Sequence, residues 1–204
     1  MPKSAAFLGT LLAIGVVGCA GSSAGTAPKA PATTPSPNGV NQAPVPAESN
    51  PPGDIPDNLA FVPYTNKAGG YRFTHPEGWA EIAHGADVRF TDKLNGVSVS
   101  VVPGNQPPTV SSARSSDVAR LRQTTPAFRL QQVSSVSLPA GRAVLIVFRR
   151  NTNPDPVTGR QYRDEVQEFE FWHHGEIVRL DLFGPVGADN VDAYRTMSRS
   201  LSLS

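Results

Sequence analysis

The chain has 204 residues, and its 18 Lys and Arg against 17 Asp and Glu give a formal net charge of +1 at pH 7. A chain so close to neutral lacks the basic excess of nucleic-acid-binding proteins, and anionic lipid is equally disfavoured as a main partner. It contains one Cys, which excludes an internal disulfide.

The N-terminal segment has the features of a secretory signal peptide that ends at this cysteine. A basic start at Lys3 precedes an apolar run over residues 5–17, which is shorter than the ~20 residues of a membrane-spanning helix. The last residues before the end of the segment are Val16, Val17, Gly18 and Cys19. This pattern resembles the bacterial lipobox, and the resemblance implies that Cys19 receives a diacylglyceryl group (a palmitate-type anchor) and that residues 1–18 are removed as the signal peptide.

The predicted modification determines where the protein is located. Two acyl chains anchor a protein stably to a bilayer, whereas one chain binds only marginally. A diacylglyceryl group on Cys19 therefore predicts a lipoprotein held at the extracytoplasmic face of the cell membrane. Removal of residues 1–18 leaves 17 basic and 17 acidic residues in the mature chain. The alternative is a free or buried cysteine after a fortuitous apolar start.

Residues 19–57 differ in composition from the rest of the chain. Nine of the 20 prolines fall between Pro28 and Pro56, among Ala, Ser, Thr, Gly and Asn. Such a segment buries too little apolar surface to offset the entropy of ordering, so it is predicted to be a disordered tether. A spacer is favoured over a Pro-rich ligand for a partner. From residue 58 the composition becomes globular, which predicts one domain over residues 58–204.

The first half of this domain is predicted to form β-structure. Alternation of apolar and polar residues, together with turn signals, predicts strands over residues 71–75, 79–82, 88–91 and 97–101. The dipeptide Asn95-Gly96 is typical of a hairpin turn, so it is predicted to connect the third and fourth of these strands.

The second half is predicted to combine strands with two helices. Strands are predicted over residues 128–138, 143–148, 166–174 and 177–183. The unbroken apolar run 143–148 indicates a central strand that is covered on both faces. A short helix over 118–122, with an N-cap signal at Ser115 and Ser116, ends before Pro126, and a second helix covers 191–201. The pattern predicts an α+β fold, with an antiparallel sheet flanked by helices.

One hairpin allows a prediction of register. If His174 and Gly175 form a two-residue turn, one face carries mostly apolar pairs, which are Phe171–Val178, Phe169–Leu180 and Gln167–Leu182. The other face then carries Trp172–Ile177, Glu170–Arg179 and Glu168–Asp181. The last is a like-charge pair, which is destabilising unless a neighbour compensates it, and Arg149 or Arg150 is expected to do so.

The stretch from Gly69 to Ile82, GYRFTHPEGWAEI, resembles the beginning of PsbP/Mog1-like domains. In that family an aromatic-x-Phe strand leads into Pro-x-Gly-Trp, and the matching residues here are Tyr71, Phe73, Pro76, Gly78 and Trp79. The later order of elements fits as far as Leu203. The resemblance implies a non-catalytic α–β–α sandwich that binds or helps assemble other components, as in photosystem subunits, a Ran-binding protein and actinobacterial lipoproteins of the LpqN type. It carries no catalytic residues over to this chain.

The residues with catalytic or ligand-binding potential do not form a recognisable motif. The adjacent His173 and His174 are expected to point to opposite faces of a strand, which argues against a shared metal. The phosphate-loop and dinucleotide-binding patterns are absent from the sequence. We therefore expect that the protein is not an enzyme and that it binds neither a metal ion nor a cofactor. The acidic set Glu165, Glu168, Glu170 and Asp181, with its interleaved arginines, is interpreted as a solvated face.

Two functions of different classes remain. The first is a non-catalytic protein-interaction or assembly module, with a candidate interaction face made of Trp172, Ile177, Glu170 and Arg179. For Trp172 and Ile177, the favoured interpretation is that a helix covers them, and an exposed patch for a partner is the alternative. The alternative is a carrier or sensor that binds a lipid or another small apolar envelope ligand between sheet and helix. A cavity of ~300 Å³ or more would favour this second function.

Overall fold

The protein is described from a computed structural model, which places residues 39–47 and 53–204. The predicted signal peptide, the lipobox residues Val16, Val17 and Gly18, the lipidation site Cys19 and most of the predicted tether lie outside these residues. Within the described part of the chain, no helix is long and apolar enough to cross a membrane.

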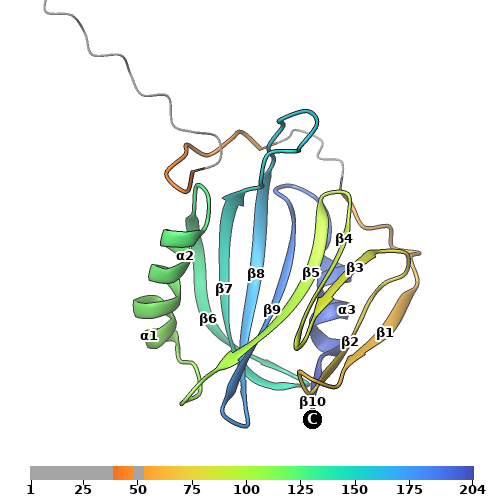
Figure 1. The fold of residues 1–204 in the computed structure, drawn as a ribbon, viewed down its shortest axis with the longest axis vertical. Helices are drawn as coiled ribbons and strands as arrows, with labels where there is room; N and C mark the ends of the chain where they lie inside the picture. Colours follow the sequence, from red (N-terminus) through yellow and green to blue (C-terminus); the bar gives the residue numbers. More distant parts are fainter. Residues whose placement is uncertain (1–38, 48–52) are drawn as a thin grey trace, which may run out of the picture. The chain divides into compact units, whose positions relative to one another are not determined.

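The centre of the domain is a seven-stranded antiparallel sheet with the order β3-β4-β5-β9-β8-β7-β6 (Figure 1). Its strands are β3 (Ala80–His84), β4 (Asp87–Asp92), β5 (Asn95–Pro103), β6 (Arg129–Leu138), β7 (Gly141–Asn151), β8 (Arg163–His173) and β9 (Glu176–Pro185). The apolar run predicted as a central strand lies in β7, which pairs with β6 on one side and β8 on the other. The strands predicted from alternation are therefore confirmed, with different end residues.

One face of this sheet is covered by a second, three-stranded sheet and the C-terminal helix. The smaller sheet contains β1 (Phe61–Asn66), β2 (Tyr71–Pro76) and β10 (Ser202–Leu203), and the helix is α3 (Val191–Ser200). Tyr71 and Phe73 of β2 and Met197 of α3 share a buried cluster with Val97 and Leu180 of the large sheet. We call this side the core face. In α3 the prediction was wrong for Val191, which is 62% exposed although the spacing assigned it to the apolar side.

A single helical segment covers β6 and β7 on the opposite face. It contains α1 (Val110–Ser112), a π-helical turn (Ala113–Asp117) and α2 (Val118–Thr124). Val118 and Leu121 pack there on Ile146 and Phe148. The predicted start near Ser115 was wrong, because the segment begins at Thr109, whose side chain and that of Ser112 form a capping box. The predicted antiparallel α+β fold is confirmed.

The predicted register of the β8–β9 hairpin is confirmed at all six predicted pairs. His174 and Gly175 form the turn, and both have positive φ, 50° and 87°. Phe171 and Leu180 on the core face are at most 1% exposed.

The predicted turn at Asn95-Gly96 was wrong by two residues. Lys93 and Leu94 form the turn between β4 and β5, since Asp92 pairs with Asn95 and Thr91 with Gly96. Asn95 is buried and its side chain bonds to Gly53 O and to Asn190 Nδ2. Gly96 is needed because a Cβ at this position would overlap the ring of Phe183.

Folded contacts extend into the region assigned to the tether. Ile55 is 5% exposed and joins the buried cluster of the core face, while its N–H donates to Asn190 Oδ1 over 2.8 Å. Further towards the N-terminus, residues 39–47 bond to the end of β7, where Asn151 Nδ2 donates to Gln42 Oε1 and Ala43 O. Two stretches before residue 58 therefore belong to the folded domain and not to a tether.

Candidate functional site: the charged face of the large sheet

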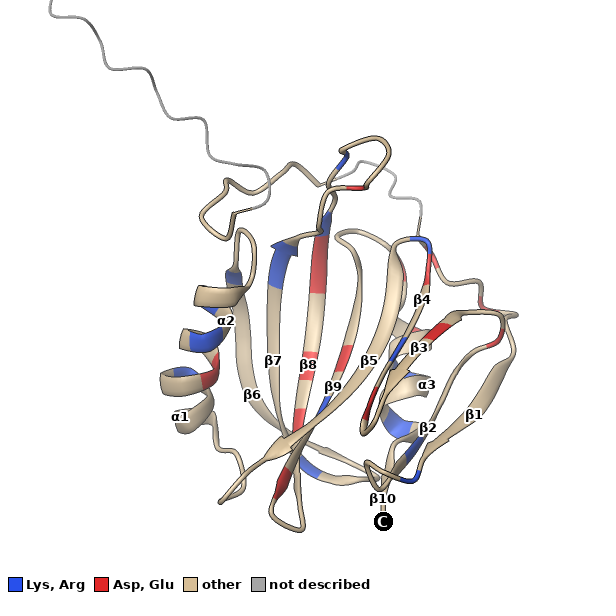
Figure 2. Ribbon diagram, in the orientation of Figure 1, with Lys and Arg blue, Asp and Glu red and all other residues tan. Residues whose placement is uncertain are grey.

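Opposite the core face, β8 and β9 carry a row of ionisable side chains. Because side chains alternate along a strand, the residues two apart on β8 and β9 share this side of the sheet. The charged face consists of Asp164, Glu168, Glu170, Arg179 and Asp181. Figure 2 shows acidic residues following one another along β8, with β9 beside it. Trp172 and Ile177 lie at one end of this row, next to the turn.

The interpretation of the acidic set as a solvated face was wrong for Glu168 and Glu170, whereas the side chain of Glu165 is 37% exposed. Glu170 is 0% exposed, Asp164 2% and Glu168 3%. The helical segment 110–124 contacts this face through Arg120 and Asp117. Buried carboxylates require charged partners, because an unpaired ion in a low-dielectric interior is strongly destabilising.

Arginines from the sheet and from α2 supply these partners. Arg179 Nε lies 2.8 Å from Glu170 Oε1, as the cross-strand pairing predicts, and Arg179 Nη2 lies 3.3 Å from Asp117 Oδ1. Arg149 or Arg150 was predicted to offset the repulsion between Glu168 and Asp181, and for Glu168 this prediction was wrong. Arg120 of α2 binds it, with Nη2 3.0 Å from Oε1.

Of the two arginines that were expected in that role, Arg150 opposes the rise in the pKa of Asp181, but both form their ion pairs with other residues. Arg149 Nε lies 3.0 Å from Glu165 Oε2, and Arg150 Nε lies 3.7 Å from Asp164 Oδ2. Each pairs with the residue directly opposite on β8, because the β7–β8 register places it there. Arg120 could not be predicted as the partner of Glu168 from the sequence, because the side of α2 that faces the sheet depends on tertiary packing.

The carboxyl groups of the charged face bind protons more tightly than exposed ones. Burial, and for Glu168 the neighbouring Asp181 charge as well, raises the pKa of Glu168 and of Glu170 to about 7. Burial likewise raises the pKa of Asp164 and of Asp181 to about 6 against the opposing effect of Arg150. Glu170 Oε2, Asp164 Oδ1 and Asp181 Oδ1 are buried and have no hydrogen-bond partner among the described residues. The network is therefore close to its titration range at neutral pH.

At the turn end, Trp172 is 40% exposed, so the helical segment does not cover it. Its indole Nε1–H donates to Gly104 O over 3.0 Å, and Gly104 N–H donates to Gly175 O over 2.8 Å. A Cβ at Gly104 would clash with Ile177, which is half-buried beneath this loop. The predicted outward pair therefore forms a fixed patch, which we call the Trp172 patch and define as Trp172, Ile177 and Gly104. Glu170 and Arg179, the other two members of the predicted interaction face, are too buried to contact a partner.

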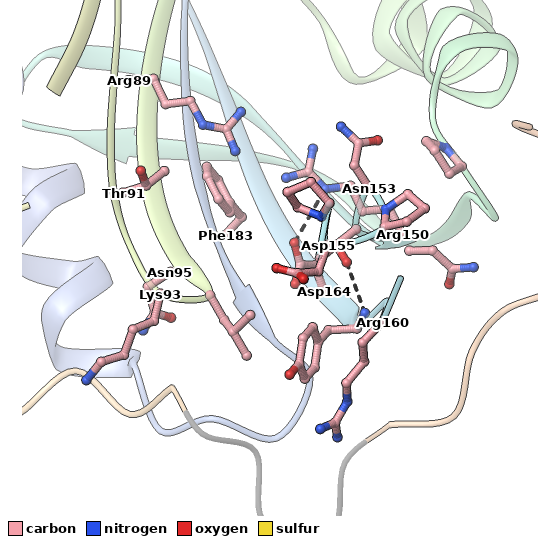
Figure 3. Close-up of a pocket in the computed structure, with 17 residues that line it drawn as sticks. Arg89, Thr91, Lys93, Asn95, Arg150, Asn153, Asp155, Arg160, Asp164 and Phe183 are labelled. Atoms are coloured by element: carbon pink, nitrogen blue, oxygen red, sulfur yellow. Dashed lines mark hydrogen bonds and ion pairs between the residues drawn. The ribbon is translucent and has the colours of Figure 1, made fainter. Parts of the chain in front are cut away.

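A cleft of about 460 Å³ opens at the opposite end of the charged face (Figure 3). It lies between the end of β4 and the loop that joins β7 to β8, and Asp164 and Phe183 are among its lining residues. Its basic lining residues are Arg89, Lys93, Arg150 and Arg160. The sequence analysis identified none of them as a site, because they come from separate segments.

The space between the large sheet and α3, where an apolar ligand was considered, is occupied by side chains. Met197 of α3 is fully buried and Leu201, directly after it, is 2% exposed. Two clefts adjoin α3, one of about 200 Å³ beside Tyr194 and one of about 260 Å³ beside Ala193 and Thr196. The basic cleft is larger than these, lies elsewhere and has a different chemical character.

The histidines do not assemble a metal site in the described part of the chain, where no group of three or more His, Cys, Asp or Glu is placed to hold an ion. His75 is buried and stacks on Phe90 with ring centroids 3.7 Å apart, and burial lowers its pKa. The expectation that His173 and His174 point apart was wrong. Their rings lie 4.0 Å apart edge to face, because His174 already belongs to the turn.

Comparison with known proteins identifies a family likeness in the first part of the domain. Residues 59–121 match the PsbP family, and this range includes the predicted motif from Tyr71 to Trp79. No curated protein matches the chain.

Several solved structures are similar in fold. Cyanobacterial PsbP (CyanoP) from Synechocystis sp. PCC 6803 has 17% identity, with 75% of this chain and 99% of that one covered and a TM-score of 0.48. The Ran-binding protein Mog1p of Saccharomyces cerevisiae has 10% identity, 72% and 96% coverage and a TM-score of 0.47. LpqN, involved in cell envelope biogenesis of Mycobacterium tuberculosis, has 10% identity, 72% and 92% coverage and a TM-score of 0.44. The chain spans 48% of a longer Bacteroides thetaiotaomicron protein that it also matches. The domain is thus an antiparallel α+β domain whose residues 59–121 are similar to the PsbP family.

Proposed function

We propose that this protein is a lipid-anchored protein of the cell envelope whose PsbP/Mog1-like domain binds another protein without catalysing a reaction. The Trp172 patch is the observation on which this proposal depends. A large aromatic ring is 40% exposed, although its only polar atom is already bonded within the domain.

The geometry of the patch suits an interface anchor. Trp is enriched among the residues that contribute most to binding, and a rigid side chain loses little conformational entropy when a partner covers it. The hydrogen bond to Gly104 and the close packing of Gly104 on Ile177 hold the ring in place before binding. An apolar partner surface would therefore gain contact area without leaving the indole N–H unpaired.

The test is site-specific photo-crosslinking in the producing cell. A photoreactive residue at Glu176, which is exposed and adjoins Ile177, should crosslink to a discrete partner, and Trp172→Ala should abolish the adduct. Val157 is the matched control, because it is 90% exposed but lies in the loop at the other end of the sheet. Equal adducts with and without Trp172 would overturn the proposed interface.

The anchor is tested separately. The lipobox pattern at Val16, Val17, Gly18 and Cys19 supports lipidation, and Cys19→Ala should leave an unprocessed precursor without acyl chains. Intact mass and partitioning into detergent are the measurements. Identical masses and identical partitioning for the variant and the wild type would contradict the anchor without affecting the Trp172 patch.

A further inference from the structure

Positive charge is concentrated in the cleft although the whole chain is nearly neutral. Four basic residues and two acidic residues line it, an excess of two positive charges in about 460 Å³. The acidic residues are Asp155 and Asp164. The net charge of the chain argued against anionic partners in general, but a local excess of this kind attracts a small anion.

Arg89 lines the cleft without a paired carboxylate among the described residues. Within the described residues it has neither an ion pair nor a hydrogen bond, and its Cζ lies 4.6 Å from the ring centroid of Phe183. The Cζ of Arg150 lies 5.0 Å from the same centroid. Two guanidinium groups are thus held against one aromatic ring, an arrangement in which each repels the other. Partial burial and, secondarily, the charge of Arg150 lower the pKa of Arg89.

The two carboxylates of the cleft already have partners. Asp155 Oδ1 accepts hydrogen bonds from Val157 N, Thr158 N and Thr158 Oγ1 at 2.7–3.1 Å, which closes the tip of the loop. Asp164 pairs with Arg150, and its side chain is 3% exposed. Neither of them forms an ion pair with Arg89 within 4.0 Å, and the charges of Asp164 and Asp181 act on this guanidinium only over longer distances.

We propose that this cleft binds the phosphate group of a small phosphorylated molecule, with Arg89 as its principal charged contact. The excess of two positive charges matches a phosphomonoester, which carries about −1.5 to −2 at pH 7. Guanidinium groups match phosphate oxygens bidentately, and the Thr91 hydroxyl and the Asn153 amide of the lining can donate further hydrogen bonds. The volume leaves room for a glycerol or sugar part beside the phosphate.

Two sources of such a group are chemically equivalent, a soluble phosphate ester and a lipid headgroup. The lipid source rests on the proposed anchor. Residues 39–47 bond to Asn151, which lines the cleft, and about 20 residues separate Gly39 from Cys19. A chain of that length reaches at most about 70 Å, so an anchored protein keeps the cleft close to the membrane surface. The soluble source requires no anchor.

Calorimetric titration of the full-length protein in a non-ionic detergent tests the proposal. The soluble probes are inorganic phosphate and glycerol 3-phosphate, and the lipid probes are phosphatidic acid and phosphatidylcholine in the same micelles. Arg89→Gln removes the charge and keeps much of the side-chain volume. The matched control is Arg142→Gln, since Arg142 is exposed near the other end of β7, away from the cleft. Circular dichroism checks that both variants fold.

The expected result is binding of glycerol 3-phosphate that Arg89→Gln weakens by ~10-fold or more and Arg142→Gln leaves unchanged. If phosphatidic acid binds more tightly than glycerol 3-phosphate with the same dependence on Arg89, and phosphatidylcholine does not bind, the headgroup is the source. No binding of any phosphate probe would overturn the proposal, as would equal affinities for the wild type and Arg89→Gln. Neither result would affect the Trp172 crosslink, so the two proposals fail separately.

Discussion

The two faces of the β8–β9 hairpin share one strand register, but one carries apolar side chains and the other carries charged ones. On the core face, Phe169, Phe171 and Leu180 pack against apolar side chains of the smaller sheet and α3. On the charged face, Glu168 and Glu170 are buried to the same degree, but arginines surround them. Burial alone therefore does not identify a core, and the two faces should respond differently to substitution and to pH.

The largest effect is expected on the core face. Phe171→Ala removes a ring that is 1% exposed and leaves a cavity where the neighbours are fixed by the sheet. The free energy of unfolding should fall by about 3–5 kcal/mol, measured by denaturant titration. Because no ionisable group is involved, the loss should be the same at pH 5 and pH 7.5. A pH-dependent loss would contradict the separation of the two faces.

Breaking an ion pair on the charged face should have a similar or slightly smaller effect. Arg179→Ala leaves Glu170 buried without its 2.8 Å partner and should destabilise the domain by about 3 kcal/mol at pH 7.5. At pH 5 the loss should be smaller, because the raised pKa of Glu170 allows it to become neutral. The control is Arg179→Met with Glu170→Leu, which removes both charges and should restore most of the stability. If the double variant were as unstable as Arg179→Ala, the buried charge would not be the cause.

The wild-type protein should itself be more stable in mild acid. Glu168 and Glu170 have a pKa of about 7 in the folded protein against an ordinary 4.5, and Asp164 and Asp181 about 6 against 3.8. At a pH between the ordinary pKa of a group and its raised pKa in the folded protein, the folded protein binds more protons than the unfolded chain. The free energy of unfolding therefore falls as the pH rises through this range. We expect a loss of roughly 1–3 kcal/mol from pH 5 to pH 7.5, and a smaller one in Glu168→Gln. A gain in stability over this range would contradict the burial of the network.

The smallest effect on stability is expected at Trp172. The ring is 40% exposed, so Trp172→Ala should lower the free energy of unfolding by only about 1 kcal/mol, far less than Phe171→Ala on the other face of the same strand. Thermal and denaturant unfolding compare the two variants. A loss as large as that of Phe171→Ala would assign Trp172 to the core and remove the basis of the proposed interface.

These differences show what sequence alone can predict in this domain. Alternation and the turn at Gly175 predict the hairpin register, because both are properties of neighbouring residues. The burial of Glu170 depends on a helix about 50 residues away in the sequence. The alternation of apolar and polar residues along a strand cannot predict such a distant contact. Asn95 was misassigned to a turn because its partners Gly53 and Asn190 are distant in the chain.

The basic cleft was missed for the same reason. Arg89, Arg150 and Arg160 belong to β4, β7 and a loop, and only the strand order β4-β5-β9-β8-β7 brings them to one opening. The sequence signal that could have directed attention there is the NTNPDPVTG loop after Arg150, since loops at the end of a sheet often carry binding residues.

The central claim is that the domain binds a protein partner through the Trp172 patch. The most direct test is the affinity of the crosslinked partner, once purified, for the wild type, Trp172→Ala and Val157→Ala. The account predicts that Trp172→Ala weakens binding by about 1–2 kcal/mol or more, while Val157→Ala, which is at the other end of the sheet, leaves the affinity unchanged. Equal affinities for Trp172→Ala and the wild type, with both proteins folded, would contradict it.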